Sequence, residues 1–176
     1  MSSELPNHPD NNKTPPKPIG IDHPDNSKNV PSELTHYRVY LAAYLGKPSH
    51  HAIYVEIDTS CDPAREYRWH VQGNIMQGMT FVNESCRNPL KSETGESVRP
   101  IGWVLREDFF NRVQHVCRGI PPPKKQYDGP RKRLFPHEPI RKCQEWTAEA
   151  IDALRRAEVL ERLSSTDEKG TIMAHH

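Results

Sequence analysis

Residues 50–57 read His-His-Ala-Ile-Tyr-Val-Glu-Ile, and residues 67–72 read Tyr-Arg-Trp-His-Val-Gln. Both stretches alternate between two kinds of side chain with a period of two, which is typical of half-buried β-strands. A polar loop over residues 58–63 separates them and predicts that they form a hairpin. The two faces of this hairpin carry different residues: His51, Ile53, Val55, Ile57, Tyr67, Trp69 and Val71 on the apolar face, and His50, Ala52, Tyr54, Glu56, Arg68, His70 and Gln72 on the other.

The predicted hairpin sets two histidines on one face. In a register with Ala52 across from His70, the imidazole of His50 is a diagonal neighbour of His70, within side-chain reach. A slip of one residue would turn His70 into the core, which the tryptophan at position 69 disfavours. His51 lies on the apolar face, where we expect a hydrogen-bonded core residue or part of a substrate subsite; the same slip would exchange its role with that of His50.

The rest of the chain predicts further strands followed by helices. Alternation predicts strands, and apolar residues at steps of three and four predict helices that end near glycine or polar sequence. We therefore expect an α+β fold with a small antiparallel sheet packed against two or three helices. In chain order, the expected elements outside the hairpin are a strand from about residue 35, a short strand at 79–82, a polar loop at 83–96, an irregular edge strand at 98–104, and helices at 107–119 and 141–163.

Composition divides the chain into one domain and two tails. The chain has 176 residues, of which 34% are hydrophobic, and 17 prolines. Residues 1–34 are polar and proline-rich and contain His-Pro-Asp-Asn twice, so we expect a disordered low-complexity tail, with a linear motif for a protein partner as the alternative. We expect a single domain at 35–163 and a second disordered tail at 164–176.

Charge and cysteine usage limit the classes of function. Lys and Arg number 24 against 23 for Asp and Glu, a formal charge of +1 that gives no general attraction to nucleic acid. Because the four cysteines form no Cys-x-x-Cys pair, we expect free thiols, no metal site and no cofactor. The start of the chain has no apolar signal segment and no stretch long enough to span a bilayer, so a cytoplasmic protein is expected.

Cys143 is the candidate nucleophile. It opens the predicted last helix, in Arg141-Lys142-Cys143-Gln144-Glu145-Trp146, where unpaired backbone N–H groups and the helix dipole favour a thiolate. A neighbouring imidazole would take the thiol proton and pass it to a leaving group. Cys143 also belongs to the apolar stripe of that helix, which is equally typical of a small core residue.

These residues resemble the permuted papain-like thiol hydrolases, in particular the branch around lecithin:retinol acyltransferase. His50-His51-Ala52-Ile53-Tyr54-Val55 is similar to the first-strand pattern of that branch, His70 approximates the histidine of the next strand, and Cys143 matches a cysteine at a helix start. The resemblance implies that Cys143 is the nucleophile, His50 its base and His70 the residue that orients the base. Expected substrate contacts are His51, Tyr54, Gln72, Gln144 and Trp146.

The chain also resembles a group of small fungal proteins that share Ile101-Gly102-Trp103-Val104 and the Cys-Gln-x-Trp helix start. We therefore expect a thiol hydrolase or acyltransferase that acts on an amide, ester or thioester of a small molecule or peptide, as an accessory enzyme of fungal metabolism. The alternative is a binding module that keeps the fold without the chemistry and uses the groove between helix and sheet together with the basic loop at residues 124–133. The flanking residues Lys142 and Gln144 depart from the acyltransferase pattern, which keeps this alternative open.

Overall fold

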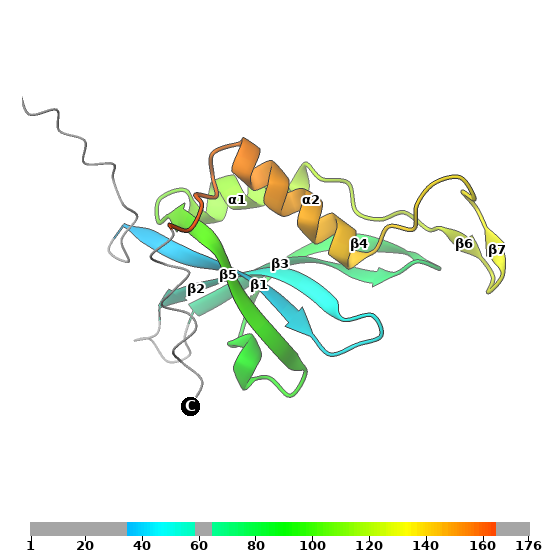
Figure 1. Ribbon diagram of the computed structural model, residues 1–176, viewed down its shortest axis with the longest axis horizontal. Coiled ribbons are helices and arrows are strands. Elements are labelled where there is room, and N and C mark those ends of the chain that lie inside the picture. The colour runs from blue at the N-terminus through cyan, green and yellow to red at the C-terminus, as the bar shows by residue number, and fades with distance from the viewer. Residues whose placement is uncertain (1–34, 59–64, 165–176) are drawn as a thin grey trace, which may run out of the picture. The chain divides into compact units, whose positions relative to one another are not determined.

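The architecture of the chain comes from a computed structural model that describes residues 35–58 and 65–164. Five strands form one antiparallel sheet in the order β4-β3-β2-β1-β5, and helices α1 and α2 lie together over one of its faces (Figure 1). The predicted α+β class is therefore confirmed. The elements are β1 (His36–Tyr44), β2 (His50–Asp58), β3 (Arg65–Asn74), β4 (Gly78–Cys86), a 3₁₀ turn η1 (Pro89–Lys91), β5 (Gly95–Leu105), α1 (Phe109–Arg118), β6 (Tyr127–Asp128), β7 (Lys132–Arg133) and α2 (Cys143–Arg156).

The described elements fall within the domain that composition predicts, since they run from His36 to Arg156. The two predicted tails, residues 1–34 and 164–176, lie outside the described residues apart from Ser164. The loop between β2 and β3, residues 59–64 with Cys61, lies outside them as well.

The central hairpin has the predicted register. Ile53 pairs with Trp69 and Val55 with Tyr67 in an antiparallel ladder. Extended by one residue, this register sets Ala52 across from His70, as the alternation of the sequence predicts. A sheet with a buried apolar face resists slippage, because a shift by one residue would move every apolar side chain to the wrong face.

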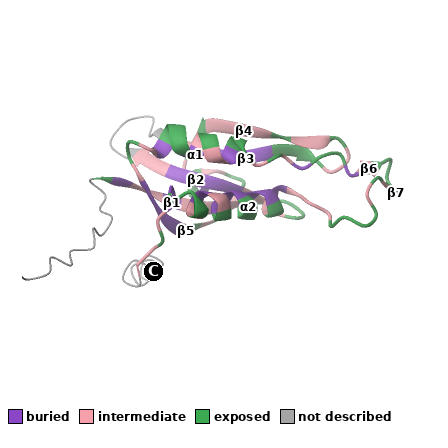
Figure 2. Ribbon diagram, turned by 90° about the horizontal axis from the view of Figure 1, so that it is seen from above, coloured by how far each residue is buried: buried purple, intermediate pink, exposed green. Residues whose placement is uncertain are grey.

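The main core lies between the sheet and the helices. The apolar face of β2 and β3 contributes its alternate residues to it, and α2 contributes a stripe at helical spacing. Figure 2 shows buried residues along the central strands and exposed ones on the outer surface of the helices. The buried members of this cluster are Val39, Ile53, Val55, Trp69, Val71, Ile101, Val104, Phe109, Val113, Cys117, Cys143, Trp146, Ala150, Ile151, Leu154, Val159 and Leu160.

The opposite face of the sheet has its own, smaller cluster. Ala42, Tyr44, Ala52 and Tyr54 are buried there, with Tyr40, Cys86 and Val98 packed against them. These residues occupy the positions that alternate with the main core. The two faces of the central strands are therefore cleanly separated, and the face that carries His50 and His70 is the one turned away from α2.

Two predicted boundaries differ from the structure at the strands. β4 continues to Cys86 rather than ending at Val82, because it pairs with β3 along its whole length, up to Glu66–Cys86. β5 is longer than predicted but is an irregular edge strand, with register shifts on its pairing with β1. Pairing with a neighbouring strand thus extends β4 and β5 through polar residues whose sequence pattern predicts a loop.

The last helix is shorter than predicted. It ends at Arg156 instead of near Leu163, because Glu158 adopts a left-handed conformation with a φ of 54°. The chain then folds back against β5, where Trp103 and Glu161 exchange both backbone hydrogen bonds at 3.0 and 2.9 Å. Ala157, three residues after the buried Leu154, is exposed, whereas Leu160 is buried through this returning segment.

Gly102 makes this return possible, and replacing it tests the contact. A Cβ at Gly102 would lie 2.1 Å from the carbonyl oxygen of Glu161, which is backbone and cannot move aside cheaply. Gly102→Ala is expected to lower the free energy of unfolding by about 1–3 kcal/mol, as overpacking does. Urea unfolding would measure it, with Ser97→Ala, at an exposed position of the same strand, as the control. Equal stability of both variants would contradict the close approach.

Candidate functional site

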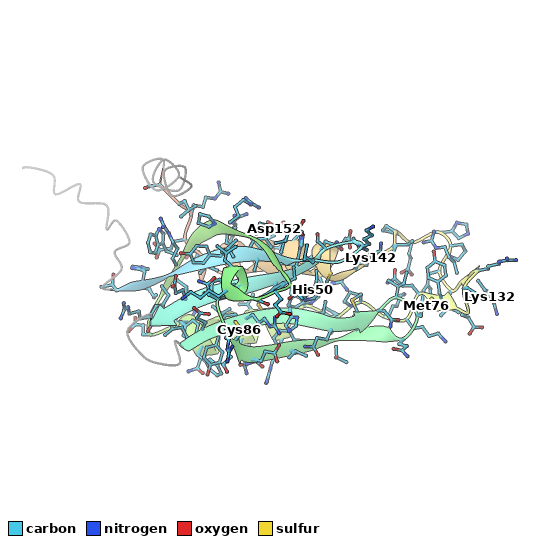
Figure 3. All side chains as sticks on the ribbon, turned by 90° about the horizontal axis from the view of Figure 1, so that it is seen from below. His50, Met76, Cys86, Lys132, Lys142 and Asp152 are labelled. Atoms are coloured by element: carbon cyan, nitrogen blue, oxygen red, sulfur yellow. The ribbon has the colours of Figure 1, made fainter. Side chains whose placement is uncertain are left out.

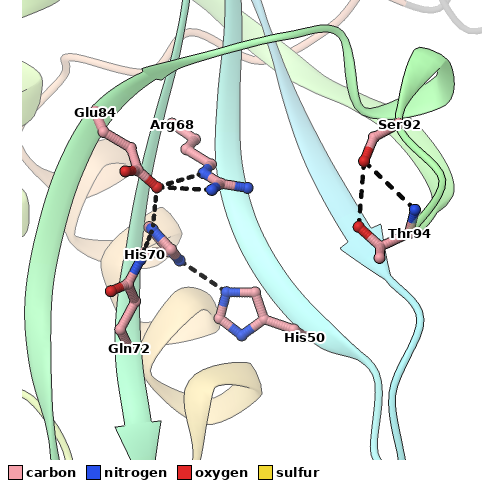
Figure 4. A network of polar contacts seen from close by, with 7 residues as sticks. All are labelled: His50, Arg68, His70, Gln72, Glu84, Ser92 and Thr94. Carbon is pink, nitrogen blue, oxygen red and sulfur yellow. Dashed lines mark hydrogen bonds and ion pairs between the residues drawn. The ribbon is translucent and has the colours of Figure 1, made fainter.

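The structure brings the two predicted histidines together on the face of the sheet opposite α2. His50 begins β2 and His70 lies on β3, and their rings meet edge to face with centroids 5.0 Å apart. Nε2 of His50 lies 2.8 Å from Nδ1 of His70, within hydrogen-bonding distance (Figure 4). The strand register thus produces a direct contact between the imidazoles.

A carboxylate on the next strand extends this contact into a chain. Glu84 of β4 lies directly across from Arg68 of β3, and its Oε1 accepts hydrogen bonds from Nε and Nη2 of Arg68 at 2.9 and 2.7 Å. The same oxygen lies 3.2 Å from Nε2 of His70. Gln72 approaches the same nitrogen of His70 at 3.4 Å, a longer contact. Three adjacent strands therefore supply one connected polar cluster.

The order of the hydrogen-bonded residues, His50 to His70 to Glu84, determines which ring nitrogens carry protons. Burial acts to raise the pKa of Glu84, but the hydrogen bonds and charge of Arg68, followed by those of His70, outweigh it and hold that pKa below its usual value. An ionised carboxylate can only accept, so Nε2 of His70 carries the proton and Nδ1 of His70 accepts from Nε2 of His50. Nδ1 of His50 is then left with its lone pair free, and no described residue bonds to it. This nitrogen is the basic atom of the cluster.

Both imidazoles are held in the neutral form. Burial, and then the charge of Arg68, lower the pKa of His70 to about 4. The same two causes, in the same order, lower the pKa of His50. At neutral pH both rings therefore have an unprotonated nitrogen that can accept a proton, although the lowered pKa makes each a weaker base than a free histidine.

A pocket of about 350 Å³ opens onto these histidines. Its walls come from the end of β1, the start of β2 and the end of β3, and they include Gln72, one of the predicted substrate contacts. Val71, whose side chain belongs to the core under α2, also lines this pocket. The described pairing of β2 with β3 ends at Ile53 and Trp69. His50 and Val71 lie beyond this end, where no backbone pairing of the two strands is described. The full lining is Tyr44, Leu45, His50, Arg68, His70, Val71, Gln72, Gly73 and Thr94.

Cys143 lies in the first turn of the last helix, as predicted, and is the first residue of α2, which starts two residues after the predicted start at 141. Its thiol lies on the core side of the sheet. Cys143 is 8% exposed and belongs to the cluster that contains Val71 and Trp146. Its described polar contact joins Sγ to Oε1 of Gln144 at 3.7 Å. Alternation directs His50 and His70 to the other face, so the pleat of the sheet, which the sequence-based prediction did not weigh, separates the imidazoles from the apolar stripe that holds the thiol.

The backbone around Cys143 is nevertheless fastened to the start of β2. The Gln144 side chain donates a hydrogen bond to the carbonyl oxygen of Ser49 at 2.7 Å, and the Thr147 hydroxyl lies 3.3 Å from the carbonyl oxygen of His51. These two bonds hold the helix start to the residues on either side of His50. The helix end is itself fixed, because the backbone N–H of Lys142 donates to Oε2 of Glu145 at 2.7 Å (Figure 3 labels Lys142 and His50).

The remaining predicted substrate contacts divide into accessible and buried residues. His51 and Gln144 line a second pocket, between α2 and β5. Tyr54 is 1% exposed and Trp146 is fully buried, so neither offers a surface to a substrate as placed. Trp146 instead packs on Phe81 and donates its indole N–H to the carbonyl oxygen of Ile120. Trp146 follows the apolar stripe of α2, which is the usual signal of a core residue. Tyr54 lies on the face of β2 that carries His50 and is buried by the smaller cluster there.

Sequence reasoning did not identify Glu84 as part of the site. The short strand predicted at 79–82 left Glu84 in a loop, whereas the structure continues β4 through it. Thr80, Val82 and Glu84 lie across from Gln72, His70 and Arg68 in turn. A longer strand with this alternation would have identified the carboxylate as a neighbour of the histidines.

Among residues 35–58 and 65–164, no group of three or more His, Cys, Asp or Glu side chains is arranged to hold a metal ion. No helix in the same described residues is long and apolar enough to cross a membrane. The fold and site therefore define an α+β domain with a histidine pair, backed by a carboxylate, at the mouth of a pocket.

A family model covers nearly all of this domain. The chain belongs to DUF6540, described as a family of unknown function, whose model matches residues 39–161. No curated protein and no solved structure matches the sequence significantly. The matched segment contains His50, His70, Glu84 and Cys143, so the whole candidate site lies within the family domain.

The low pKa of His70 makes stability depend on pH in a defined direction. In the unfolded chain a histidine has its ordinary pKa of about 6.5, whereas folded His70 accepts a proton only near pH 4. Between those values the unfolded state binds more protons, so the free energy of unfolding falls as the pH is lowered, by on the order of 3 kcal/mol.

Unfolding in urea at several pH values would measure this loss, and NMR titration of the His70 ring should give a midpoint near pH 4. The pH dependence should become shallower in His70→Gln. Arg68→Gln should raise the His70 midpoint, because it removes a nearby positive charge. A midpoint near 6.5 in the native protein would contradict the described environment.

Proposed function

We propose that the protein is a thiol-dependent hydrolase or acyltransferase, with Cys143 as nucleophile, His50 as base and His70 as the residue that orients the base. The observation that carries the proposal is the pair of hydrogen bonds that fasten the start of α2 to the carbonyl oxygens of Ser49 and His51, on either side of His50. A nucleophile and its base must be held at a short, constant separation, and these bonds supply that constraint at the backbone.

The proposed reaction requires the Cys143 thiol and His50 to meet at the end of the described β2–β3 ladder, across the sheet that separates them. Val71 supports this meeting point, because it lines the histidine pocket and also belongs to the core cluster that contains Cys143. The described ladder between the two strands stops short of this point. A carbonyl group bound in the pocket would then meet the thiol from one side and the imidazole from the other.

In the proposed reaction, Nδ1 of His50 takes the proton from the Cys143 thiol. The thiolate attacks the carbonyl carbon of an amide, ester or thioester, the bond to the leaving group breaks, and His50 returns the proton to that group. Water or an amine then attacks the acyl-thioester, and its proton passes back through His50. The free N–H groups at the start of α2 favour the thiolate and the developing oxyanion.

Glu84 acts in this scheme as a positioning residue. Its ionised carboxylate keeps the proton of His70 on Nε2, which makes Nδ1 of His70 an acceptor for His50 and turns Nδ1 of His50 toward the substrate. The chain of two histidines and a carboxylate adds a member to the arrangement implied by the resemblance to permuted papain-like thiol hydrolases. That resemblance supports the same assignment of roles.

The second candidate function is a binding module with an inactive thiol. The burial of Cys143 in the apolar core and the outward turn of His50 and His70 favour it. In that case the histidine pocket binds a ligand and Cys143 is a packing residue. The two functions differ in how the thiol reacts.

Alkylation of Cys143 separates them. An unassisted thiol with a pKa near 8.5 is only about 0.3% ionised at pH 6. If His50 is its base, Cys143 should react with iodoacetamide at pH 6 faster than the buried Cys117, and His50→Ala should slow it about tenfold or more. Mass spectrometry of peptides would measure each rate.

His115→Ala is the matched control, since it removes an exposed imidazole of α1, outside both pockets. It should leave the rate unchanged. If Cys143 reacts no faster than Cys117, and His50→Ala has no effect, the protein is a binding module. Loss of reactivity in His51→Ala alone would assign the base to His51. Labelling by a thioester acyl probe, with Cys143→Ala as control, would then test acyl transfer directly.

Glu84→Gln tests the positioning role. It removes the charge that fixes the proton of His70, so the alkylation rate of Cys143 at pH 6 should fall about tenfold, and less at pH 9, where the thiol ionises unaided. Glu84→Asp should restore part of the rate. A uniform decrease at both pH values would indicate a structural effect on the strand instead.

A further inference from the structure

The second pocket runs along α2 on the side of the sheet that faces the helices. It has a volume of about 370 Å³ and lies between α2 and the strands β1 and β5. This volume is typical of a site for a small organic ligand. The lining residues are Leu41, His51, Arg99, Ile101, Gln144, Thr147, Ala148, Ile151, Asp152 and Arg155.

The packing of α2 explains why a groove remains there. The core stripe of the helix is directed at β2 and β3, whereas a second stripe, at steps of three and four from Gln144 to Arg155, faces β1 and β5. Leu41 and Arg99 are paired across β1 and β5 and so lie on the same face of the sheet. The groove therefore has the helix as one wall and the edge of the sheet as the other.

The groove combines apolar walls with two guanidinium groups. Leu41, Ile101 and Ile151 supply the apolar surface, and Arg99 and Arg155 supply the positive charge. Arg99 forms no ion pair with any residue that the structure describes. The one acidic residue of the lining is Asp152, whose side chain is 68% exposed and lies 3.7 Å from Nη1 of Arg155. Positive charge therefore exceeds negative charge in the groove.

Arg155 also carries an unsatisfied donor. Its Nε atom is buried and has no hydrogen-bond partner among residues 35–58 and 65–164. The side chain as a whole is 36% exposed, so a ligand in the groove meets the accessible part of the guanidinium. The acceptor that suits a guanidinium best is a carboxylate, which takes two parallel hydrogen bonds from one arginine. The apolar walls next to it favour a ligand whose anionic group is attached to a hydrocarbon part.

We propose that this groove binds an amphipathic carboxylate, with the carboxylate on Arg155 and Arg99 and the hydrocarbon part between Leu41, Ile101 and Ile151. The site is separate from the histidine pocket, which opens on the other face of the sheet. Gln144 marks the end of the groove nearest to Cys143, about 16 Å along the helix from Arg155 at 1.5 Å per residue. The binding site stands whether or not Cys143 reacts.

Octanoate is a suitable probe, because it carries one carboxylate on a flexible hydrocarbon chain. Its binding to the full chain can be followed by ¹H–¹⁵N and methyl NMR, where saturable shifts are expected at the Gln144 side-chain amide and the Ile151 methyl groups. Acetate lacks the hydrocarbon part and octanamide lacks the charge. Both should bind about tenfold more weakly than octanoate, since each loses one of the two recognition elements.

Arg155→Gln and Arg99→Gln should each weaken octanoate binding about tenfold, a loss typical of a charged hydrogen bond. Arg131→Gln is the matched control, because it removes an exposed arginine next to Lys132, at the tip of the β6–β7 hairpin and away from Asp152 (Figure 3). It should bind octanoate as the native protein does. If Arg155→Gln fails to fold, Arg99→Gln, whose side chain is exposed, tests the same charge.

Cys143→Ala should bind octanoate with unchanged affinity. A failure of the proposed thiol chemistry can therefore be distinguished from a failure of the proposed carboxylate site. The absence of saturable binding would overturn the proposal. If octanamide binds as tightly as octanoate, or if both arginine variants bind octanoate as tightly as the native protein does, the proposal is overturned too, because the groove would then be an apolar surface without a carboxylate site.

Discussion

The antiparallel register of β2, β3 and β4 is the constraint on which the rest of the structure depends. With Ile53 across from Trp69 and Arg68 across from Glu84, every second residue of three strands is committed to one face of the sheet. One face becomes the floor of the main core under the helices. The other collects His50, His70 and Glu84, which would be scattered in any other register.

The same constraint places the candidate nucleophile and the two histidines on opposite faces of the sheet. Hydrophobic burial requires α2 to lie over the apolar face, and this brings the Cys143 thiol into the core. The hydrogen bonds from α2 to Ser49 and His51 then hold the helix start beside the histidine strand. The proposed reaction therefore depends on the end of the described β2–β3 ladder at Ile53 and Trp69, next to which His50, His70 and Val71 lie.

Much of the fold follows from short-range patterns in the sequence. The alternation in residues 50–57 and 67–72 identifies the hairpin, its faces and its register, and the contact of His50 with His70 follows from it. The end of α1 before Gly119 agrees with its local signal, and α2 starts at Cys143, two residues after the predicted start. Predictions were wrong where partners distant in the sequence decide the outcome: β3 extends β4 to Cys86, and the return of the chain onto Trp103 accompanies the early end of α2.

The sequence by itself determined the α+β class, the hairpin and the two faces of its strands, because alternation and helical spacing are properties of neighbouring residues. Only the tertiary structure decided which face the helices cover, and hence that Cys143 lies on the core side while His50 and His70 face away. It also decided that Glu84 completes the histidine pair and that Arg99 and Arg155 share a groove. These are contacts between segments far apart in the chain, and their geometry depends on how the sheet and helices pack.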